Sequence, residues 1–272
     1  MRAHLIGALR QWVEDFDIDG FRFDDSDITP LDFLDEIRAA LLQVRPSIGL
    51  ISQAYDEFHH LAACDLTYEG GTRGLILALA NGTSTAAGFI RQWQDAAYSF
   101  PRGALRMRWL EEKEQGRAWR LYGPALHRAA AAIMLTVDGV PHLLMGQEFN
   151  EPRWRDWTSL FEPFTLDWPA FDVPTFAHYQ ALIRLRNHCP VLRQGKLEFL
   201  EDQPAGGLAY WRGEGAGRIL VVVNLSAQTI GLPAQAHGLA CLYASDPAHA
   251  TGASVDAAHG LPAHACLLAR AG

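Results

Sequence analysis

The chain has 272 residues, of which 49% are hydrophobic and 20% are charged, and its formal net charge at pH 7 is −8. A chain of this length can bury a substantial core in one large or two moderate domains. The negative charge argues against nucleic acid as a partner, since phosphate binding needs a basic surface. No apolar run approaches the roughly 20 residues of a membrane span, so the composition predicts a folded protein that binds neither nucleic acids nor membranes.

Helix-like and strand-like segments alternate as far as residue 190. Helices are predicted over 1–16, 30–44, 86–98, 117–135 and 173–187, and strands over 19–24, 48–53 and 106–111. Alternation of this kind is typical of a parallel sheet covered by helices. From Gly195 onward the pattern changes to short apolar runs at 207–212, 218–224 and 238–244, separated by glycine and proline, which predicts an antiparallel β domain.

The strand at 19–24 carries the most informative polar pair. Alternate side chains of an extended chain point the same way, so Arg22 and Asp24 are expected to project together. An arginine this close keeps an aspartate ionised, as a carboxylate nucleophile requires. The alternative is a surface turn that feeds a strand and holds one ion pair.

Several segments in register along the chain resemble motifs of one enzyme family. The segments are Asp19–Asp24, Ile48–Gln53, Cys64–Tyr68, Arg106–Glu111, Leu135–Pro141 with Leu143–Glu148, and the V-x-x-N-x-S-like run that includes Ile219–Asn224. Their order and spacing resemble the fourth to eighth barrel strands and the C-terminal domain of the α-amylase family of glycoside hydrolases (family 13). Several ordered motifs are more specific than any one of them.

This resemblance implies an α/β fold, a partial TIM (β/α)8 barrel of about strands four to eight followed by a small antiparallel β domain. The expected domains are a partial barrel over residues 1–192 and an antiparallel β-sandwich over residues 193–272. Strands one to three would precede Met1, so the start is expected to be truncated. The amphipathic segment at the start lacks the apolar core of a signal peptide, and the cytoplasm is the expected location. An incomplete barrel leaves open strand edges, which predicts self-association or a partner chain that supplies the missing strands.

The family resemblance also implies the site. Asp24 corresponds to the catalytic nucleophile, Gln53 stands where the family has its general-acid glutamate, and Glu114 stands where it has a second aspartate. Arg22, Asp27 and Lys113 occupy substrate-binding positions, and Lys113 replaces the family's histidine. Without the resemblance, residues 111–117 form a charged run that is typical of a solvated turn.

The chemistry implied is retaining cleavage of α-glucosidic bonds, in which a second, protonated carboxyl about 5 Å from the nucleophile donates a proton to the leaving oxygen. Gln53 has no proton to release, and loss of a general acid costs roughly 10²- to 10⁴-fold in rate. Two hypotheses follow: an impaired hydrolase or transglycosylase that acts on starch-like or oligosaccharide substrates, or a non-catalytic carbohydrate-binding or partner-binding pseudoenzyme or truncated gene product.

No metal or other cofactor is predicted. The four cysteines, Cys64, Cys189, Cys241 and Cys266, are scattered without a C-x-x-C pair, which argues against a structural zinc site and favours buried free thiols. The neighbours His59 and His60 have no carboxylate or cysteine at metal-ligand spacing, and they are interpreted as part of a solvated loop.

Overall fold

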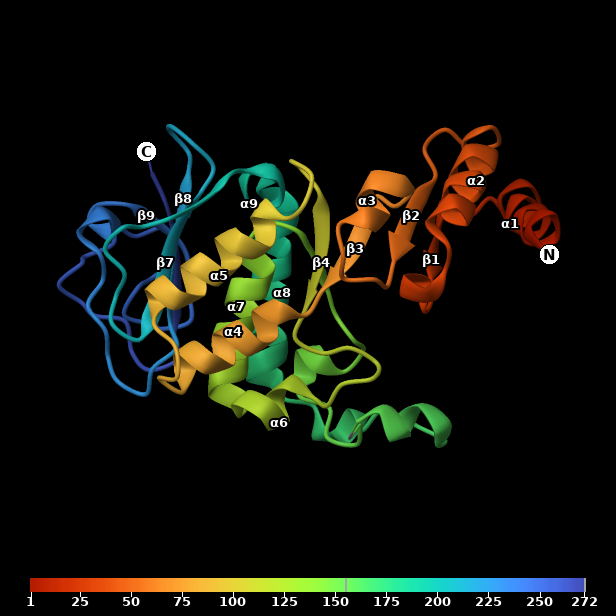
Figure 1. Ribbon diagram of the computed structural model, residues 1–272. Coiled ribbons are helices and arrows are strands. Elements are labelled where there is room, and N and C mark those ends of the chain that lie inside the picture. The colour runs from red at the N-terminus through yellow and green to blue at the C-terminus, as the bar shows by residue number, and fades with distance from the viewer. Residues whose placement is uncertain (155, 272) are drawn as a thin grey trace. The chain divides into compact units, whose positions relative to one another are not determined.

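The computed structural model describes residues 1–154 and 156–271 (Figure 1). The chain divides into two compact units. The first unit contains Met1–Glu69 and Gln94–Met107, and the second contains Gly70–Trp93 and Arg108–Gly272. No helix among the described residues is long and apolar enough to cross a membrane.

Parallel strands form the centre of the first unit. The three strands are β1 (Gly20–Phe23), β2 (Gly49–Ser52) and β3 (Leu66–Glu69), and β1 pairs with β2, and β2 with β3, in parallel. Gly20 lies opposite Gly49, and a Cβ at Gly20 would lie 2.2 Å from the carbonyl oxygen of Gly49. A side chain at position 20 would therefore force the two strands apart.

The second helix of the first unit buries an apolar stripe, as its periodicity predicts, whereas the first helix buries a single residue. Val13 is the buried residue of the first helix, and Leu34, Ile37 and Leu41 are the buried residues of the second; all four join Leu50 of β2 in one core. Figure 1 shows the first two helices beside β1. The helical segments are α1 (Arg2–Phe16), η1 (Ser26–Ile28), α2 (Leu31–Leu42) and α3 (Phe58–Ala62).

Strand β4 (Leu105–Trp109) contributes residues to both units; it follows β3 in the strand order, and β5 (Val140–His142) follows it. The other elements of the second unit before its C-terminal sheet are helical. They are α4 (Gly71–Ala80), α5 (Ala86–Tyr98, which the unit boundary divides), α6 (Ala118–Tyr122), α7 (Pro124–Thr136), η2 (Gln147–Phe149), η3 (Trp157–Phe161), η4 (Trp168–Ala170), α8 (Val173–His188) and α9 (Pro190–Gln194).

The prediction of one continuous helix over 117–135 was wrong. Gly123 has φ 75°, and Pro124 begins α7 at its first turn. A left-handed glycine ends a helix at low cost, and proline suits the start of the next one. Two helices therefore replace one, and the alanine-rich α7 is buried along most of its length.

The chain after residue 195 forms one five-stranded antiparallel sheet with the strand order β6-β7-β8-β10-β9. One face packs on α7 and α8, as Figure 1 shows, and the other carries a separate apolar cluster that includes Leu220, Val222 and Leu267. The predicted boundary between residues 192 and 193 falls within α9 and remains a proposal. The strands are β6 (Leu197–Phe199), β7 (Gly207–Arg212), β8 (Ile219–Asn224), β9 (Ala240–Ala244) and β10 (Cys266–Arg270), with η5 (Ala234–Ala236) between β8 and β9.

Two arginines bind backbone carbonyl groups at the C-terminal ends of α7 and α9. Arg186 of α8 donates to the carbonyl oxygens of Leu135, Val137, Gly139 and Leu192 at 2.6–3.2 Å. Arg212 of β7 donates to the carbonyls of Thr136 and Gly195, both at 2.6 Å. Carbonyl groups at a helix C-terminus lack partners within the helix, and these two guanidinium groups satisfy them. Burial lowers the pKa of Arg186 to about 10.

Candidate active site

Asp24 is the first residue after β1. Its carboxylate is exposed and forms an ion pair with Arg22, the side chain two residues earlier. Arg22 Nε also donates to the hydroxyl of Tyr68 on β3 at 3.2 Å, and its guanidinium lies 5.4 Å from the centre of that ring. The expected pairing of Arg22 with Asp24 is therefore present, and Tyr68 holds the arginine in place from a second strand.

Arg22 stays positively charged in this position. Burial acts to lower the pKa of the guanidinium, but the hydrogen bonds to Asp24 and to Tyr68 outweigh it and raise the pKa above its ordinary value. A permanent cation in contact with a carboxylate favours the ionised form of that carboxylate. The pair thus provides the electrostatic setting that a carboxylate nucleophile needs.

Gln53 follows β2 and is linked to the end of β1. Its side-chain oxygen Oε1 accepts a hydrogen bond from the backbone N–H of Asp25 at 2.8 Å, and its own backbone N–H donates to the carbonyl of Phe23 at 3.2 Å. Asp25 has φ 44°, in the left-handed region that non-glycine residues seldom occupy. Gln53 therefore stabilises the sharp turn that directly follows Asp24.

A buried hydroxyl network lies at the ends of the same two strands. Ser26 Oγ lies 2.7 Å from Ser52 Oγ, and Ser52 Oγ lies 2.8 Å from His59 Nδ1. The backbone N–H of Ala54 donates to both serine oxygens. The prediction of a solvated loop at His59 was wrong, because this histidine is buried in α3 and fixes the backbone on both sides of Gln53.

The remaining predicted site residues are exposed or half-buried. Asp27 lies exposed in η1 of the first unit. Lys113 and Glu114 lie in the second unit, where Lys113 Nζ and Glu114 Oε1 form an ion pair at 2.8 Å. The backbone N–H of Glu114 donates to Oε2 of the buried Glu112 at 2.9 Å. The structure thus groups Arg22, Asp24 and Gln53 in one unit and Lys113 with Glu114 in the other.

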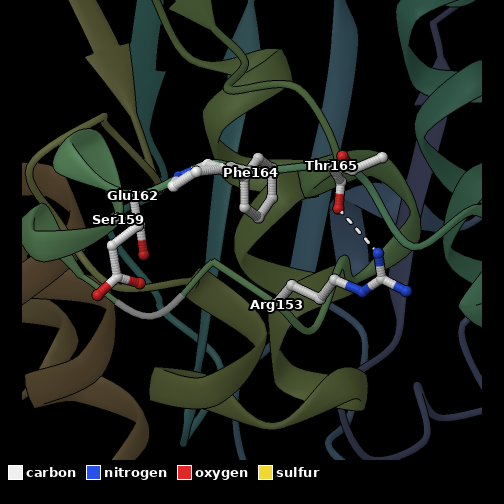
Figure 2. A pocket seen from close by; sticks show the side chains of 6 residues that line it. Arg153, Ser159, Glu162, Phe164 and Thr165 are labelled. Atoms are coloured by element: carbon white, nitrogen blue, oxygen red, sulfur yellow. Dashed lines mark hydrogen bonds between the residues drawn. The ribbon is translucent and has the colours of Figure 1, made fainter.

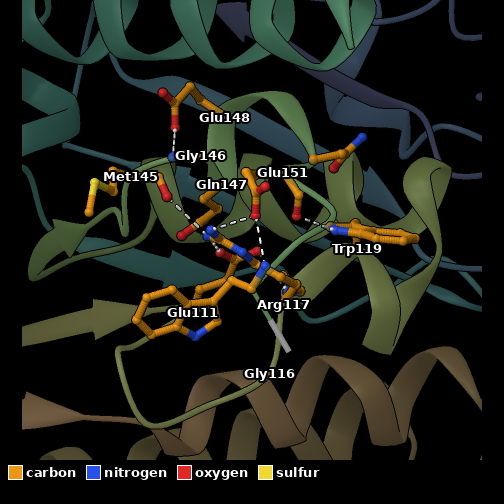
Figure 3. Close-up of polar contacts among 12 residues, drawn as sticks. Glu111, Gly116, Arg117, Trp119, Met145, Gly146, Gln147, Glu148 and Glu151 are labelled. Atoms are coloured by element: carbon orange, nitrogen blue, oxygen red, sulfur yellow. Dashed lines mark hydrogen bonds and ion pairs between the residues drawn. The ribbon is translucent and has the colours of Figure 1, made fainter. Parts of the chain in front are cut away.

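The run 111–117 is not a solvated turn, because its two ends are buried in an ionic triad (Figure 3). The Arg117 guanidinium donates to Glu111 at 2.7 Å, to Glu151 at 3.2 Å and to the carbonyl of Met145 at 3.1 Å. All three charged side chains of the triad are fully buried. Glu111 also accepts from the backbone N–H of Ala118 at 2.7 Å. Burial raises the pKa of Glu111, although Arg117 acts in the opposite direction.

Sequence reasoning missed this triad and the serine network. The spacing of Glu111 and Arg117 gives no sign of burial, since the second carboxylate, Glu151, is 34 residues further along the chain. Gly146 offers a clearer signal: its φ is 89°, and a Cβ there would lie 2.6 Å from the Cβ of Glu151. Among the described residues, no group of three or more His, Cys, Asp or Glu side chains could hold a metal ion.

Comparison with known proteins supports this architecture. A family profile described as "Domain of unknown function (DUF3459)" matches residues 201–268. The α-amylase MalA of Haloarcula japonica is 26% identical over 248 residues, which cover 88% of this chain and 36% of that protein. A cyclomaltodextrinase of Geobacillus thermopakistaniensis is 22% identical over 255 residues, 88% of this chain and 42% of that protein. The chain therefore spans about two fifths of the length of these relatives.

Solved structures agree in fold. A maltogenic α-amylase from Thermotoga neapolitana superposes with a TM-score of 0.78 at 25% identity, over 99% of this chain and 65% of that one. The α-amylase of H. orenii superposes with a TM-score of 0.82 at 21% identity, over 100% of this chain and 64% of that one. The predicted fold class, a partial (β/α)8 barrel followed by an antiparallel β domain, is confirmed.

The class of protein to which this chain is similar in fold and in sequence is the barrel glycosidase. The chain is similar to the α-amylase family of glycoside hydrolases, and the similarity covers the C-terminal part of the barrel together with the β domain that follows.

Proposed function

We propose that this chain forms part of an α-glucan-active site of the retaining type, with Asp24 as the nucleophile. The observation that carries the proposal is the Arg22–Asp24 pair at the carboxyl end of β1, held by Tyr68. Active sites of (β/α)8 barrels lie at this end of the strands, and a paired, exposed carboxylate is suited to attack an anomeric carbon. The relatives, named as amylases and cyclomaltodextrinases, support an α-glucan as the substrate class.

We further propose that the site is impaired at its acid position. Gln53 Oε1 is engaged by the N–H of Asp25, and its amide group has no acidic proton for the leaving oxygen. A missing general acid costs roughly 10²- to 10⁴-fold in rate. Glu114 and Lys113 are proposed at the stabilising and sugar-binding positions, and Asp27 at a further contact. The ion pair between Lys113 and Glu114 occupies charge and hydrogen-bonding capacity that a substrate would otherwise use.

One observation favours a second candidate, a non-catalytic carbohydrate-binding protein of the same family. The side chain at the acid position serves a structural purpose here, because it holds the turn at Asp25. A site that keeps its fold and its charged groups while it lacks the acid can still bind a saccharide. The two candidates differ in whether a covalent bond to Asp24 ever forms.

The test compares α-glucosyl fluoride with a malto-oligosaccharide as substrates of the full chain. Fluoride departs with little protonation, so turnover of the fluoride should exceed turnover of the oligosaccharide. Gln53→Glu should raise oligosaccharide turnover by about 10²-fold, the effect of a positioned acid, with the full gain after Lys113→His and Glu114→Asp are added.

The matched control is Asp24→Asn, which should abolish turnover of both substrates. Trapping with a 2-fluoro glycosyl fluoride and mass spectrometry then reports whether Asp24 carries a sugar. Rapid hydrolysis of the oligosaccharide by the unaltered chain would contradict the assignment of Gln53. Fluoride turnover that survives Asp24→Asn would contradict the assignment of the nucleophile.

A further inference from the structure

Buried side chains hold turns in both units of the chain, but with different chemistry. In the second unit the buried carboxylate of Glu151 accepts from the backbone N–H groups of Arg153 and Trp154 at 2.9–3.0 Å. In the same segment Arg153 donates to the carbonyl of Thr165 at 3.1 Å (Figure 2). A carboxylate in an ion pair can only accept hydrogen bonds, so its hydrogen bonds have one possible direction. In the first unit hydroxyl groups take this place, and a hydroxyl group can donate as well as accept.

Two serines and one histidine form the hydrogen-bond network at the ends of β1 and β2. Ser26 and Ser52 are fully buried, and His59 is 3% exposed. Both serine oxygens accept the backbone N–H of Ala54, at 3.1 and 3.0 Å. Ser26 Oγ lies 2.7 Å from Ser52 Oγ, which in turn lies 2.8 Å from His59 Nδ1. Each hydroxyl group has one hydrogen to donate, so the network has two hydrogens for these two contacts.

This count assigns the direction of each bond. If Nδ1 of His59 is unprotonated, Ser52 donates to it, Ser26 donates to Ser52, and both hydrogens are used. If Nδ1 carries a proton, His59 donates to Ser52, Ser52 donates to Ser26, and the hydrogen of Ser26 has no acceptor among the described residues. A buried donor without an acceptor destabilises the fold. The first arrangement places the ring proton on Nε2, 3.7 Å from Oδ2 of Asp56, and a nearby carboxylate favours that tautomer.

The network connects the two principal residues of the candidate active site. Ser26 is two residues after Asp24, and Ser52 and Ala54 are the neighbours of Gln53 in the sequence. The N–H of Ala54, shared by both serines, therefore ties the backbone on both sides of position 53 to the turn that follows Asp24. A displacement of about 1 Å between reacting groups can cost on the order of 10²-fold in rate. The bonds that set this spacing therefore affect the chemistry of the site.

We propose that Ser26, Ser52 and His59 form a positioning unit that fixes residue 53 relative to Asp24, with an unprotonated Nδ1 of His59 as its terminal acceptor. His59 acts through the two serines. The roles of positions 24 and 53 as nucleophile and acid rest on the proposed function, whereas the direction of the hydrogen bonds rests on the burial and the contacts of the three side chains.

Variants of His59 test the network without any assumption about activity. Asparagine places its side-chain oxygen near the position of Nδ1, whereas the longer glutamine reaches the position of Nε2. His59→Asn should therefore keep the acceptor for Ser52, and His59→Gln and His59→Leu should remove it. Hydrogen–deuterium exchange followed by mass spectrometry measures local opening at Gln53 and Ala54. Exchange there should be about tenfold faster in His59→Gln and His59→Leu, and within about twofold of the unaltered chain in His59→Asn.

Two controls make the exchange experiment decisive. Leu61→Ala, at an exposed position of α3, should leave exchange at Gln53 and Ala54 unchanged. Peptides from α2 report opening of the whole unit and should exchange at the same rate in every variant. Equal exchange at Ala54 in the three His59 variants would overturn the proposal, and so would an equal acceleration throughout α2.

Kinetics test the positioning role in the background of Gln53→Glu, where residue 53 can act as an acid. Adding His59→Gln should lower kcat for a malto-oligosaccharide about tenfold with little change in KM, because the acid is displaced. Turnover of α-glucosyl fluoride should fall less, since fluoride leaves with little protonation. His59→Asn should restore the ratio of the two rates.

The two substrates separate this proposal from the proposed function. An equal loss of turnover with both substrates would show that the network only stabilises the fold, and would overturn the positioning role. Absence of any turnover by Gln53→Glu would contradict the proposed function, and the exchange rates of the His59 variants would then decide the arrangement of the network by themselves.

Discussion

The side-chain oxygen of Gln53 accepts the backbone N–H of Asp25 at 2.8 Å and so joins the ends of two adjacent parallel strands. The turn at Asp25 is left-handed, a conformation that needs support from its surroundings. The residue at the proposed acid position therefore contributes to the shape of the site, whatever its part in chemistry.

Gln53→Ala should lower the free energy of unfolding by about 0.5–1.5 kcal/mol, the net value of one hydrogen bond. Gln53→Glu keeps an acceptor oxygen for the N–H of Asp25 and should cost less. Urea unfolding followed by circular dichroism measures both, with Gln43→Ala, an exposed glutamine at the end of α2, as the control. Equal stability of the alanine variant and the unaltered chain would show that the bond is dispensable.

Arg117→Met should destabilise the second unit strongly. The substitution keeps much of the side-chain volume but leaves Glu111 and Glu151 buried without their cation, and loss of one partner from a buried ion pair typically costs about 3–5 kcal/mol. Arg120→Met, at an exposed neighbour on α6, should cost far less. Denaturant midpoints of the two variants provide the comparison, and similar midpoints would contradict a structural role for the triad.

The stability of the chain should fall in mild acid because of two buried histidines. Burial lowers the pKa of His127 and of His178 to about 4. In the unfolded chain these histidines take up protons near pH 6.5, whereas in the folded chain they do so only near pH 4. The contribution of the two neutral histidines to the free energy of unfolding is therefore complete above pH 6.5 and is lost as the pH falls toward 4. The loss amounts to roughly 3 kcal/mol for each histidine.

A variant of His178 tests this pH dependence. Its Nδ1 lies 2.7 Å from the hydroxyl of Tyr243, and its Nε2 lies 2.8 Å from the carbonyl of Arg128. His178→Gln should remove about half of the acid-dependent loss, as measured by urea midpoints at pH 4.5 and pH 7. His4→Gln, on the exposed face of α1, should leave the pH dependence unchanged. If the urea midpoint of the His178 variant changes between pH 7 and pH 4.5 by as much as that of the unaltered chain, other groups cause the acid sensitivity.

The purified chain should self-associate through its first sheet. Within residues 1–154 and 156–271, the strand order of this sheet begins at β1, and no described strand pairs with the outer edge of β1. Such an edge invites pairing with another chain. Sedimentation velocity should show concentration-dependent oligomers.

Helix α1 offers an alternative surface for self-association, because its side chains Trp12 and Phe16 are 52% and 62% exposed. Association through the β1 edge should persist in a Trp12→Lys, Phe16→Lys double variant. A monomeric unaltered chain would refute the prediction, and a monomeric double variant would assign the contact to α1.

Much of the fold could be predicted from the sequence, because strand and helix periodicities are local. The strand that ends before Asp24, the helix over 86–98 and the three apolar runs after residue 205 lie at or near their predicted positions. Helix α4 was missed because it has ten residues and includes two glycines, which weaken a helix prediction. Strands β6 and β10 were missed because one is three residues long and the other lacks alternation.

The candidate site was predictable to a smaller extent. The contact between Arg22 and Asp24 depends on two residues of one strand, so alternation alone predicts it. The burial of Glu111 depends on a partner 40 residues away, Glu151, through Arg117, and no local pattern signals it. His59 was misjudged for a similar reason, since its partner Ser52 lies on the preceding strand.

The hydrogen bonds of Arg186 and Arg212 to the C-terminal end of α7 limit where the chain can be divided into separately expressed parts. A protein expressed from residue 193 onward would retain Arg212 but lose the carbonyl of Thr136 that it binds. A protein that ends at residue 192 would keep Arg186 but expose the sheet-facing side of α7. Modular exchange of the C-terminal sheet between relatives therefore has to carry helices α7 and α8 with it.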